Sequence, residues 1–323
     1  MQLWRIPATL IVALAAVLST ACAPASYAVR TPNASDWQYA NRGEQAGTLS
    51  LVDRRDGSDL EFSTGTLPAG LTLNGEPIDP PEFLRANLQR ELDARGLAVA
   101  VNESVGGLPR LELNTFRMVN HRQNGFSPFV TFTYFAADLH VGSLVRRIGV
   151  FIKRAKVPVW SFEEVVEPTI NQPLELAVRE LASKINSALN GARTDDATFA
   201  QLKERASHVG ADRWMAVYAL GFSNRPEAIA PIMALLSNED EYVRLAAISS
   251  IGTLGATERL ADLKNIYEDQ SRIWQDRAMA LKSIGDLATP ESQQYLATQR
   301  AYWAGQPSGK ETDWTLRVID LYL

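Results

Sequence analysis

The spacing of apolar residues along the chain changes near residue 190, and this change predicts two folded regions. Between residues 48 and 190, runs rich in aromatic and β-branched residues indicate strands, and two longer stretches have the spacing of helices. The expected strands are 48–52, 97–101, 108–119, 129–139, 144–153 and 157–166, and the expected helices are 80–95 and 172–189. This order predicts an α+β domain over 48–192, an antiparallel sheet with two helices on one face.

The region after residue 196 contains an internal repeat. Its blocks begin at Arg213, Arg244 and Arg277, which are 31 and 33 residues apart, and each has alanine three and glycine eight positions later. We expect two helices per repeat, with the glycine ending its helix in a left-handed turn. Units this small bury their apolar faces only by stacking on one another. The repeat therefore predicts an all-α solenoid over 196–323, with a degenerate last helix at 313–323.

The first 22 residues have the pattern of an export signal. Arg5 precedes an apolar run that is shorter than the roughly 20 residues needed to span a bilayer, and small residues then precede Cys22. The stretch 18–22, LSTAC, resembles the lipobox of bacterial lipoproteins, although Ser19 stands where that family prefers leucine. The resemblance implies cleavage after residue 21 and acylation of Cys22 with chains such as palmitate. A plain secretory signal and a noncleaved signal anchor are the alternatives.

The residue after the cysteine bears on location. By resemblance to the sorting rule of Gram-negative lipoproteins, Ala23 implies the outer membrane, with the chain on its periplasmic face. Three acyl chains would make the anchoring permanent, because one chain alone binds a membrane only marginally. Residues 22–47 are rich in proline, serine and asparagine and lack periodic apolar positions, so we predict a flexible tether there.

Both folded regions resemble known families. The stretches 51–55 (LVDRR), 92–97 (LDARGL) and 177–189 make the first region similar to the YajG-like group of small periplasmic lipoproteins. This resemblance implies a fold and a compartment but no reaction. The repeats over about 210–300 resemble the short HEAT repeats of the phycobilisome-lyase type. Because only scaffold residues carry that likeness, it implies no pigment-attaching activity.

Composition and motifs give little support to catalysis. A net charge of −5 does not favour binding to nucleic acid, and a single cysteine excludes an intrachain disulfide. The three histidines, His121, His140 and His208, lack ligand spacing, and no nucleophile elbow, P-loop or dinucleotide fingerprint occurs. Acidic residues at 53–61 would suit calcium only with a different spacing, so a solvated turn is favoured. We expect no enzyme, metal or cofactor.

A cluster of basic residues lies on the strands before residue 157. Its members are Arg146, Arg147, Lys153, Arg154 and Lys156, and the last four are the candidate ligand-binding residues. One interpretation is a patch that binds anionic lipid, lipopolysaccharide or glycan. The alternative is the solvated face of an edge strand, where such charges discourage aggregation.

Aromatic residues in the repeats form a second candidate surface. Trp214 and Tyr218 are one helical turn apart, and Tyr242 and Trp274 lie near the same end of the next two helices. HEAT arrays present such rows on a concave face, where aromatic residues anchor partners. The alternative is that these rings fill grooves between helices. The repeat arginines are expected to be structural, in an ion-pair ladder that includes Asp212 and Asp276.

These features favour a non-enzymatic scaffold or adaptor of the cell envelope. Its lipid would hold it at the periplasmic face of the outer membrane, and its HEAT repeats would bind a protein partner. The first alternative is an accessory subunit of a lipid, polysaccharide or protein export system, which a lipid-sized cavity in the α+β domain would favour. The second alternative, an enzyme, would require a cleft with a convergent acid, base and nucleophile.

Overall fold

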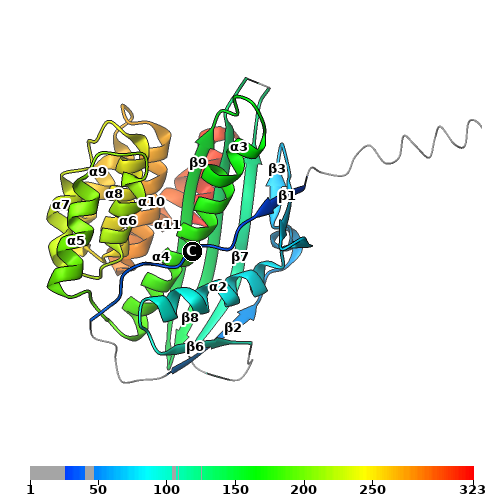
Figure 1. Ribbon diagram of the computed structural model, residues 1–323. Helices are drawn as coiled ribbons and strands as arrows, with labels where there is room; N and C mark the ends of the chain where they lie inside the picture. The colour runs from blue at the N-terminus through cyan, green and yellow to red at the C-terminus, as the bar shows by residue number, and fades with distance from the viewer. Residues whose placement is uncertain (1–25, 41–46, 104–106, 108, 125) are drawn as a thin grey trace, which may run out of the picture.

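The computed structural model describes residues 26–40, 47–103, 107, 109–124 and 126–323. The predicted export signal and Cys22 lie outside these residues. Figure 1 shows a body of sheet and helices joined along one side to an array of paired helices. An α+β region followed by an all-helical region is the predicted fold class, which the structure confirms.

The main sheet has the strand order β6-β2-β7-β8-β9, and the short strand β3 also pairs with β7. The bounds are β2 Gly47–Asp53, β3 Ser63–Gly65, β6 Val99–Asn102, β7 Arg110–His121, β8 Phe129–Val141 and β9 Leu144–Lys156. Strand β2 runs parallel to both neighbours, whereas β7, β8 and β9 form an antiparallel meander. The sheet is therefore mixed rather than wholly antiparallel, because the chain passes through a helix between β2 and β6.

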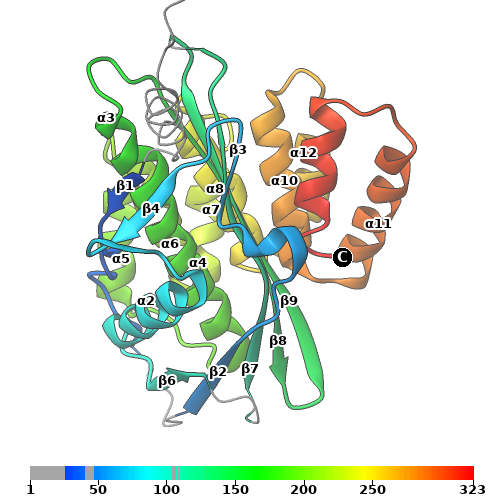
Figure 2. The same ribbon diagram turned by 90° about the vertical axis from the view of Figure 1, so that its right-hand side faces the viewer.

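Helices α2 (Pro80–Ala94) and α4 (Gln172–Leu189) cover one face of this sheet (Figure 2). Asp79 caps α2, since its carboxylate accepts a hydrogen bond from the backbone N–H of Glu82. The apolar face of α2 that packs on the sheet consists of Phe83, Leu84, Leu88 and Leu92. A π-helical turn at Glu167–Asn171 leads into α4, which is buried along most of its length because the helical array lies on its other side.

Residues 157–166 form a loop and a short helix instead of the expected strand. Strand β9 ends at Lys156, and α3 (Glu163–Val166) follows. The carboxylate of Glu164 accepts hydrogen bonds from the backbone N–H groups of residues 159–161. These donors are therefore not available to a sheet, which explains why the valines of this stretch do not extend β9.

The N-terminal segment, residues 26–40, packs on the body rather than forming the expected tether. A second, small sheet consists of β1 (Ser26–Val29), β4 (Gly70–Leu73) and β5 (Glu76–Pro77). Further along, the Tyr39 side chain is 1% exposed, and its hydroxyl donates a hydrogen bond to the backbone oxygen of Phe222. Single aromatic residues hold this segment in place, and they leave no periodic pattern in the sequence.

The C-terminal array consists of four helix pairs, α5/α6, α7/α8, α9/α10 and α11/α12. Their bounds are α5 Asp196–Ser207, α6 Arg213–Gly221, α7 Ile229–Met233, α8 Glu241–Thr253, α9 Leu260–Glu268, α10 Trp274–Leu287, α11 Pro290–Ala304 and α12 Lys310–Ile319. Asp195 and Asp240 cap α5 and α8 with their carboxylates. Successive second helices stack on one another, which buries the alanine and leucine stripes of the repeat.

The repeat glycines act differently from our expectation. A Cβ atom on Gly252 would lie 2.6 Å from the Cα atom of Ser283, and one on Gly285 would lie 2.4 Å from the ring of Tyr322. Gly221 faces the next second helix in the same way. The glycines therefore permit close helix contact. The left-handed residues come three positions later, at Asn224, Gly255 and Ala288, with φ of 55°, 66° and 51°.

The array covers the free edge of the main sheet at β9. Figure 2 shows α10 to α12 on the opposite side of the sheet from α2 and α4. The second helices contact β9 and α4, and buried residues of the two regions form one continuous apolar core. Independent folding of 48–192 remains a prediction, and these contacts identify what such a fragment would lose.

Candidate functional site

The junction between β9 and the array is where the two regions meet, and side chains cover the outer edge of the strand there. The hydroxyl of Tyr242 both accepts from the backbone N–H of Ala155, at 3.0 Å, and donates to its oxygen, at 3.2 Å. The Tyr322 hydroxyl and the Lys184 ammonium donate to the backbone oxygen of Gly149. The array, together with Lys184 of α4, thereby satisfies polar groups that would otherwise make β9 an open edge for aggregation.

Arg154 joins the two surfaces that were predicted separately. Its guanidinium carbon lies 4.1 Å from the ring centre of Trp214 and 3.9 Å from that of Tyr242, both within cation–π range. The same group donates to the backbone oxygen of Pro168 and to the side chain of Gln172. Burial lowers the pKa of Arg154. Arg154 of the predicted basic patch and two rings of the predicted aromatic row thus meet in one intramolecular contact.

The aromatic row is not an exposed binding face. Trp214 and Tyr218 are each only 3% exposed. Trp274 packs between Phe132 of β8 and Trp314 of α12, with ring centres 5.7 and 5.6 Å apart. The groove-filling alternative therefore describes these residues, and the groove is closed by the α+β domain.

The basic residues are likewise distributed over separate contacts. Lys153 is buried and pairs with Glu241 at 2.7 Å, and Arg147 pairs with Asp138 at 3.0 Å. Lys156 is the exposed member of the group. An anionic-ligand patch built from these residues does not exist, because the array buries β9 on the face that was expected to meet solvent.

A ring of four buried charges links α4 to α10. Lys184 contacts Glu180 and Asp286, each at 2.6 Å, and Lys282 contacts the same two carboxylates at 2.5 and 2.7 Å. The Tyr322 hydroxyl donates to Asp286 at 2.7 Å. The ring has no net charge, and each charge has two partners of opposite sign. Such an arrangement offsets the desolvation of the individual ions.

The pKa values of the ring follow from this geometry. Burial lowers the pKa of Lys184 despite its two carboxylate neighbours. Burial acts in the same direction on Lys282, but the carboxylates of Asp286 and Glu180 outweigh it and raise the pKa. The two ammonium groups hold the pKa of Asp286 below its ordinary value, although burial alone would raise it. The short contacts Lys184–Asp286 and Lys282–Glu180 join α4 to α10.

A second buried charge fastens the N-terminal segment. Arg95, at the end of α2, is fully buried and pairs with Glu91 at 2.6 Å. Its guanidinium also donates to the Tyr39 hydroxyl and lies 4.7 Å from the centre of the Trp37 ring. The backbone N–H and hydroxyl of Ser35 donate to Glu91. One arginine thus connects α2, the N-terminal segment and, through Tyr39, the first repeat.

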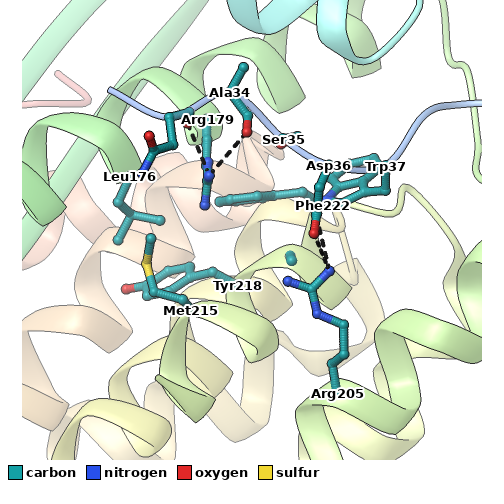
Figure 3. Close-up of a pocket in the computed structure, with 12 residues that line it drawn as sticks. Ala34, Ser35, Asp36, Trp37, Leu176, Arg179, Arg205, Met215, Tyr218 and Phe222 are labelled. Carbon is teal, nitrogen blue, oxygen red and sulfur yellow. Dashed lines mark hydrogen bonds and ion pairs between the residues drawn. The ribbon is translucent and has the colours of Figure 1, made fainter. Parts of the chain in front are cut away.

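A cavity of about 260 Å³ lies beside this segment, between residues 33–37, α4, α5 and α6 (Figure 3). The Arg179 guanidinium reaches its wall and donates to the backbone oxygens of Asn33 and Ala34. Asp36 and Arg205 pair at 3.0 Å, across from Met215. Ligand pockets for drug-sized molecules measure roughly 300–1,000 Å³, so this cavity is too small for a membrane lipid.

The repeat arginines form part of the expected ladder. Arg244 pairs with Asp276 of the next repeat at 3.0 Å. Arg277 pairs with Glu311, again one repeat later, at 2.6 Å. Each arginine also donates to a backbone oxygen near the end of the preceding helix or turn; the acceptors are Ala206, Asn238 and Tyr267. Their role is therefore to join neighbouring repeats.

The residues considered for metals have other partners. His140 pairs with Glu112, His208 lies near Glu204, and His121 packs against Phe132. The acidic turn is organised by Arg55, whose hydrogen bonds to Asp53 lower the pKa of that carboxyl against the effect of burial. Within the described residues, no group of three histidine, cysteine or acidic side chains has a geometry suited to a metal. None of the described helices is long and apolar enough to cross a bilayer.

The first helices of the last two pairs face away from the α+β domain. On α11, only Ser292 and Leu296 are buried, and Tyr302 is 58% exposed. The ring nitrogen of Trp303 donates a hydrogen bond to the hydroxyl of Tyr267 at 2.6 Å. The ring of Tyr295 packs against the ring of Tyr267. Aromatic residues of α9 and α11 therefore form a supported, partly exposed surface.

Sequence reasoning missed the charged ring and the Arg95 contact. A signal for the ring exists, because Lys282 occupies a position within a repeat helix where neighbouring blocks have Tyr218 and Ser249. The i, i+4 spacing of Lys282 and Asp286 matches that of a surface pair, however, and the partners of both residues lie about a hundred positions earlier.

Comparisons with known proteins support the repeat region. Residues 199–282 match a family model described as HEAT repeats. A stretch of 53 residues is 49% identical to the Phycocyanobilin lyase subunit alpha of Synechococcus elongatus, covering 16% of this chain and 19% of that protein. This chain thus matches less than a fifth of the length of that relative. A solved structure titled "Crystal structure of uncharacterized protein" is 13% identical, with a TM-score of 0.33, over 50% of this chain and 99% of that one. The C-terminal region is an all-helical array that contains HEAT repeats.

Proposed function

We propose that this protein is a scaffold or adaptor of the bacterial cell envelope, anchored through acylated Cys22 to the periplasmic face of the outer membrane. The HEAT match supports a role in protein binding, since such arrays provide extended contact surfaces. The α+β domain, which resembles the YajG-like group, holds the array in one fixed orientation. It acts as a rigid mount between anchor and array.

The burial of the second helices carries the proposal on how the partner binds. With α6, α8 and α10 packed against β9 and α4, the partner contacts the first helices instead. The aromatic surface of α9 and α11 is the part of this face that suits an interface anchor, because Tyr and Trp dominate binding hot spots. Tyr302, at 58% exposed, is its most accessible ring.

The test is crosslinking and purification of the protein from envelope fractions. Tyr302→Ala should reduce recovery of a specific partner, while the melting temperature remains unchanged. Leu144→Ser, at an exposed apolar site on the β8–β9 turn, is the matched control. Mass spectrometry of the N-terminus tests the anchor separately. Equal partner recovery by the aromatic variant and the control would refute the assignment of this face.

The similarity to a lyase subunit favours a second candidate, binding of a bilin-type pigment. The similarity spans only 53 residues, and the cavity of about 260 Å³ is small for such a ligand. Incubation with phycocyanobilin followed by gel filtration tests it. Visible absorbance that comigrates with the protein would support pigment binding, and its absence would leave the adaptor function.

A further inference from the structure

Exposed apolar side chains gather at one end of the main sheet. Phe126 lies in the turn between β7 and β8 and is 95% exposed, and Trp160 lies in the loop after β9 and is 92% exposed. Val157 and Val159 are exposed beside Trp160. Because Phe129 and Lys156 are partners in the β8–β9 register, the turn and the loop are neighbours. We call Phe126, Val157, Val159 and Trp160 the apolar tip.

The backbone around the apolar tip is held in place by hydrogen bonds. In the turn, the backbone N–H groups of Phe126 and Ser127 donate to the side chain of Asn124. In the loop, Glu164 accepts from the N–H groups of Val159 and Trp160 at 2.9 Å each. The rings are therefore presented outward by a pre-organised backbone, which reduces the entropy lost when they bind a surface.

The N-terminal segment begins at the same end of the molecule. The ring of Tyr27 lies 4.8 Å from that of Phe162, which itself lies 5.0 Å from that of Phe129. Figures 1 and 2 both place β1 beside α3, which follows the loop. Cys22 lies four positions before Ser26, so the chain can place Cys22 at most about 14 Å from the start of β1.

We propose that the apolar tip inserts into the interfacial region of the bilayer that holds the acylated Cys22. This inference rests on the proposed anchoring. Tryptophan and phenylalanine are suited to this region, where an apolar ring is buried near the headgroups. The charges at the rim are mixed, with exposed Lys156 and Glu163, so apolar burial rather than attraction to anionic lipid drives the contact. The anchor and the tip together fix the orientation of the HEAT array above the membrane.

The test uses the full acylated protein in vesicles of phosphatidylethanolamine and phosphatidylglycerol. An environment-sensitive fluorophore is attached to Phe126→Cys or Trp160→Cys, and lipids with nitroxide labels near the headgroup report contact. The control is Leu144→Cys, which is exposed on the turn at the opposite end of the same sheet. The emission of labels at 126 and 160 should shift to the blue and be mostly quenched by the nitroxide lipids. The emission of the label at 144 should show neither change. Raising the fraction of anionic lipid should change the quenching of these labels little.

Three results of the labelling experiment would overturn the proposal. They are equal quenching at 126 and 144, stronger quenching at 144, and a blue shift at 126 that persists without vesicles, which would indicate a protein partner or a second copy. Mass spectrometry of Cys22 in the same sample separates this failure from failure of the anchor. If Cys22 is not acylated, the partition coefficient of the unacylated chain is measured instead by sedimenting it with the vesicles. Phe126→Ser combined with Trp160→Ser should then lower its partition coefficient more than about tenfold, and an unchanged coefficient would refute the tip.

Discussion

Replacing Asp286 by asparagine tests the charged ring at the junction. The carboxylate is buried and receives Lys184, Lys282 and the Tyr322 hydroxyl. Asparagine has nearly the same shape but no charge, so two ammonium groups would share Glu180 alone. Removal of one partner from a buried ion pair costs about 3–5 kcal/mol. Since folded domains are stable by about 5–15 kcal/mol, we expect a large loss in the free energy of unfolding.

Urea unfolding followed by circular dichroism at neutral pH measures this loss. Asp320→Asn is the matched control, because its pair with Arg300 is half-exposed and should contribute less than about 1 kcal/mol. Adding Lys282→Met to the Asp286 variant removes the excess positive charge and should recover part of the stability. A loss below about 1 kcal/mol for the Asp286 variant, or no recovery in the double variant, would refute the reasoning.

The same variant gives a pH dependence. The pKa of Asp286 is lower in the folded protein than its ordinary value of 3.8. Its stabilising contribution is therefore complete well above pH 3.8 and is lost as the pH falls through the folded-state pKa. The difference in unfolding free energy between the wild type and Asp286→Asn should shrink in that acidic range. A difference that stays constant down to complete acid unfolding would contradict the ion-pair assignment.

Four further substitutions probe the packing. Gly285→Ala should cost about 1–3 kcal/mol of unfolding free energy, because the new methyl group would overlap the ring of Tyr322. Ala288→Gly should raise the free energy of unfolding by about 1 kcal/mol or less, because it relieves a left-handed residue that has a side chain. Gly255→Ala, at the equivalent position, should lower the free energy of unfolding by a similar amount, and thermal melting measures both changes. Tyr39→Phe removes a buried hydroxyl between the N-terminal segment and α6, and urea unfolding should show a loss of about 1–3 kcal/mol.

The repeats and the α+β class were predictable because both depend on local periodicity. The arginine, alanine and glycine positions recur at fixed spacing, and the long strands are rich in aromatic and β-branched residues. The role of the glycines was not predictable, since close helix contact and a left-handed turn both favour glycine. The structure decides between them by placing the left-handed turn three residues later.

The candidate site could not be predicted because its contacts are distant in sequence. Whether Arg154 meets solvent or the rings of Trp214 and Tyr242 depends on where the array docks. Long basic side chains and aromatic rings suit exposed and buried positions alike. The same ambiguity applies to Trp37 and Tyr39, two aromatic residues in a stretch rich in proline and small polar residues, where no pattern distinguishes an anchor from a tether.

The cover on β9 has a consequence for biosynthesis. The groups that close its edge belong to Tyr242 and Tyr322, which lie 87 and 173 positions after the backbone atoms that they bond. A chain made from its N-terminus completes the sheet before it completes the cover. During that interval β9 is a bare strand that can pair with another nascent copy. We therefore expect this protein to depend on a holding chaperone during folding, and variants that slow assembly of the array to form aggregates even when the final fold is stable.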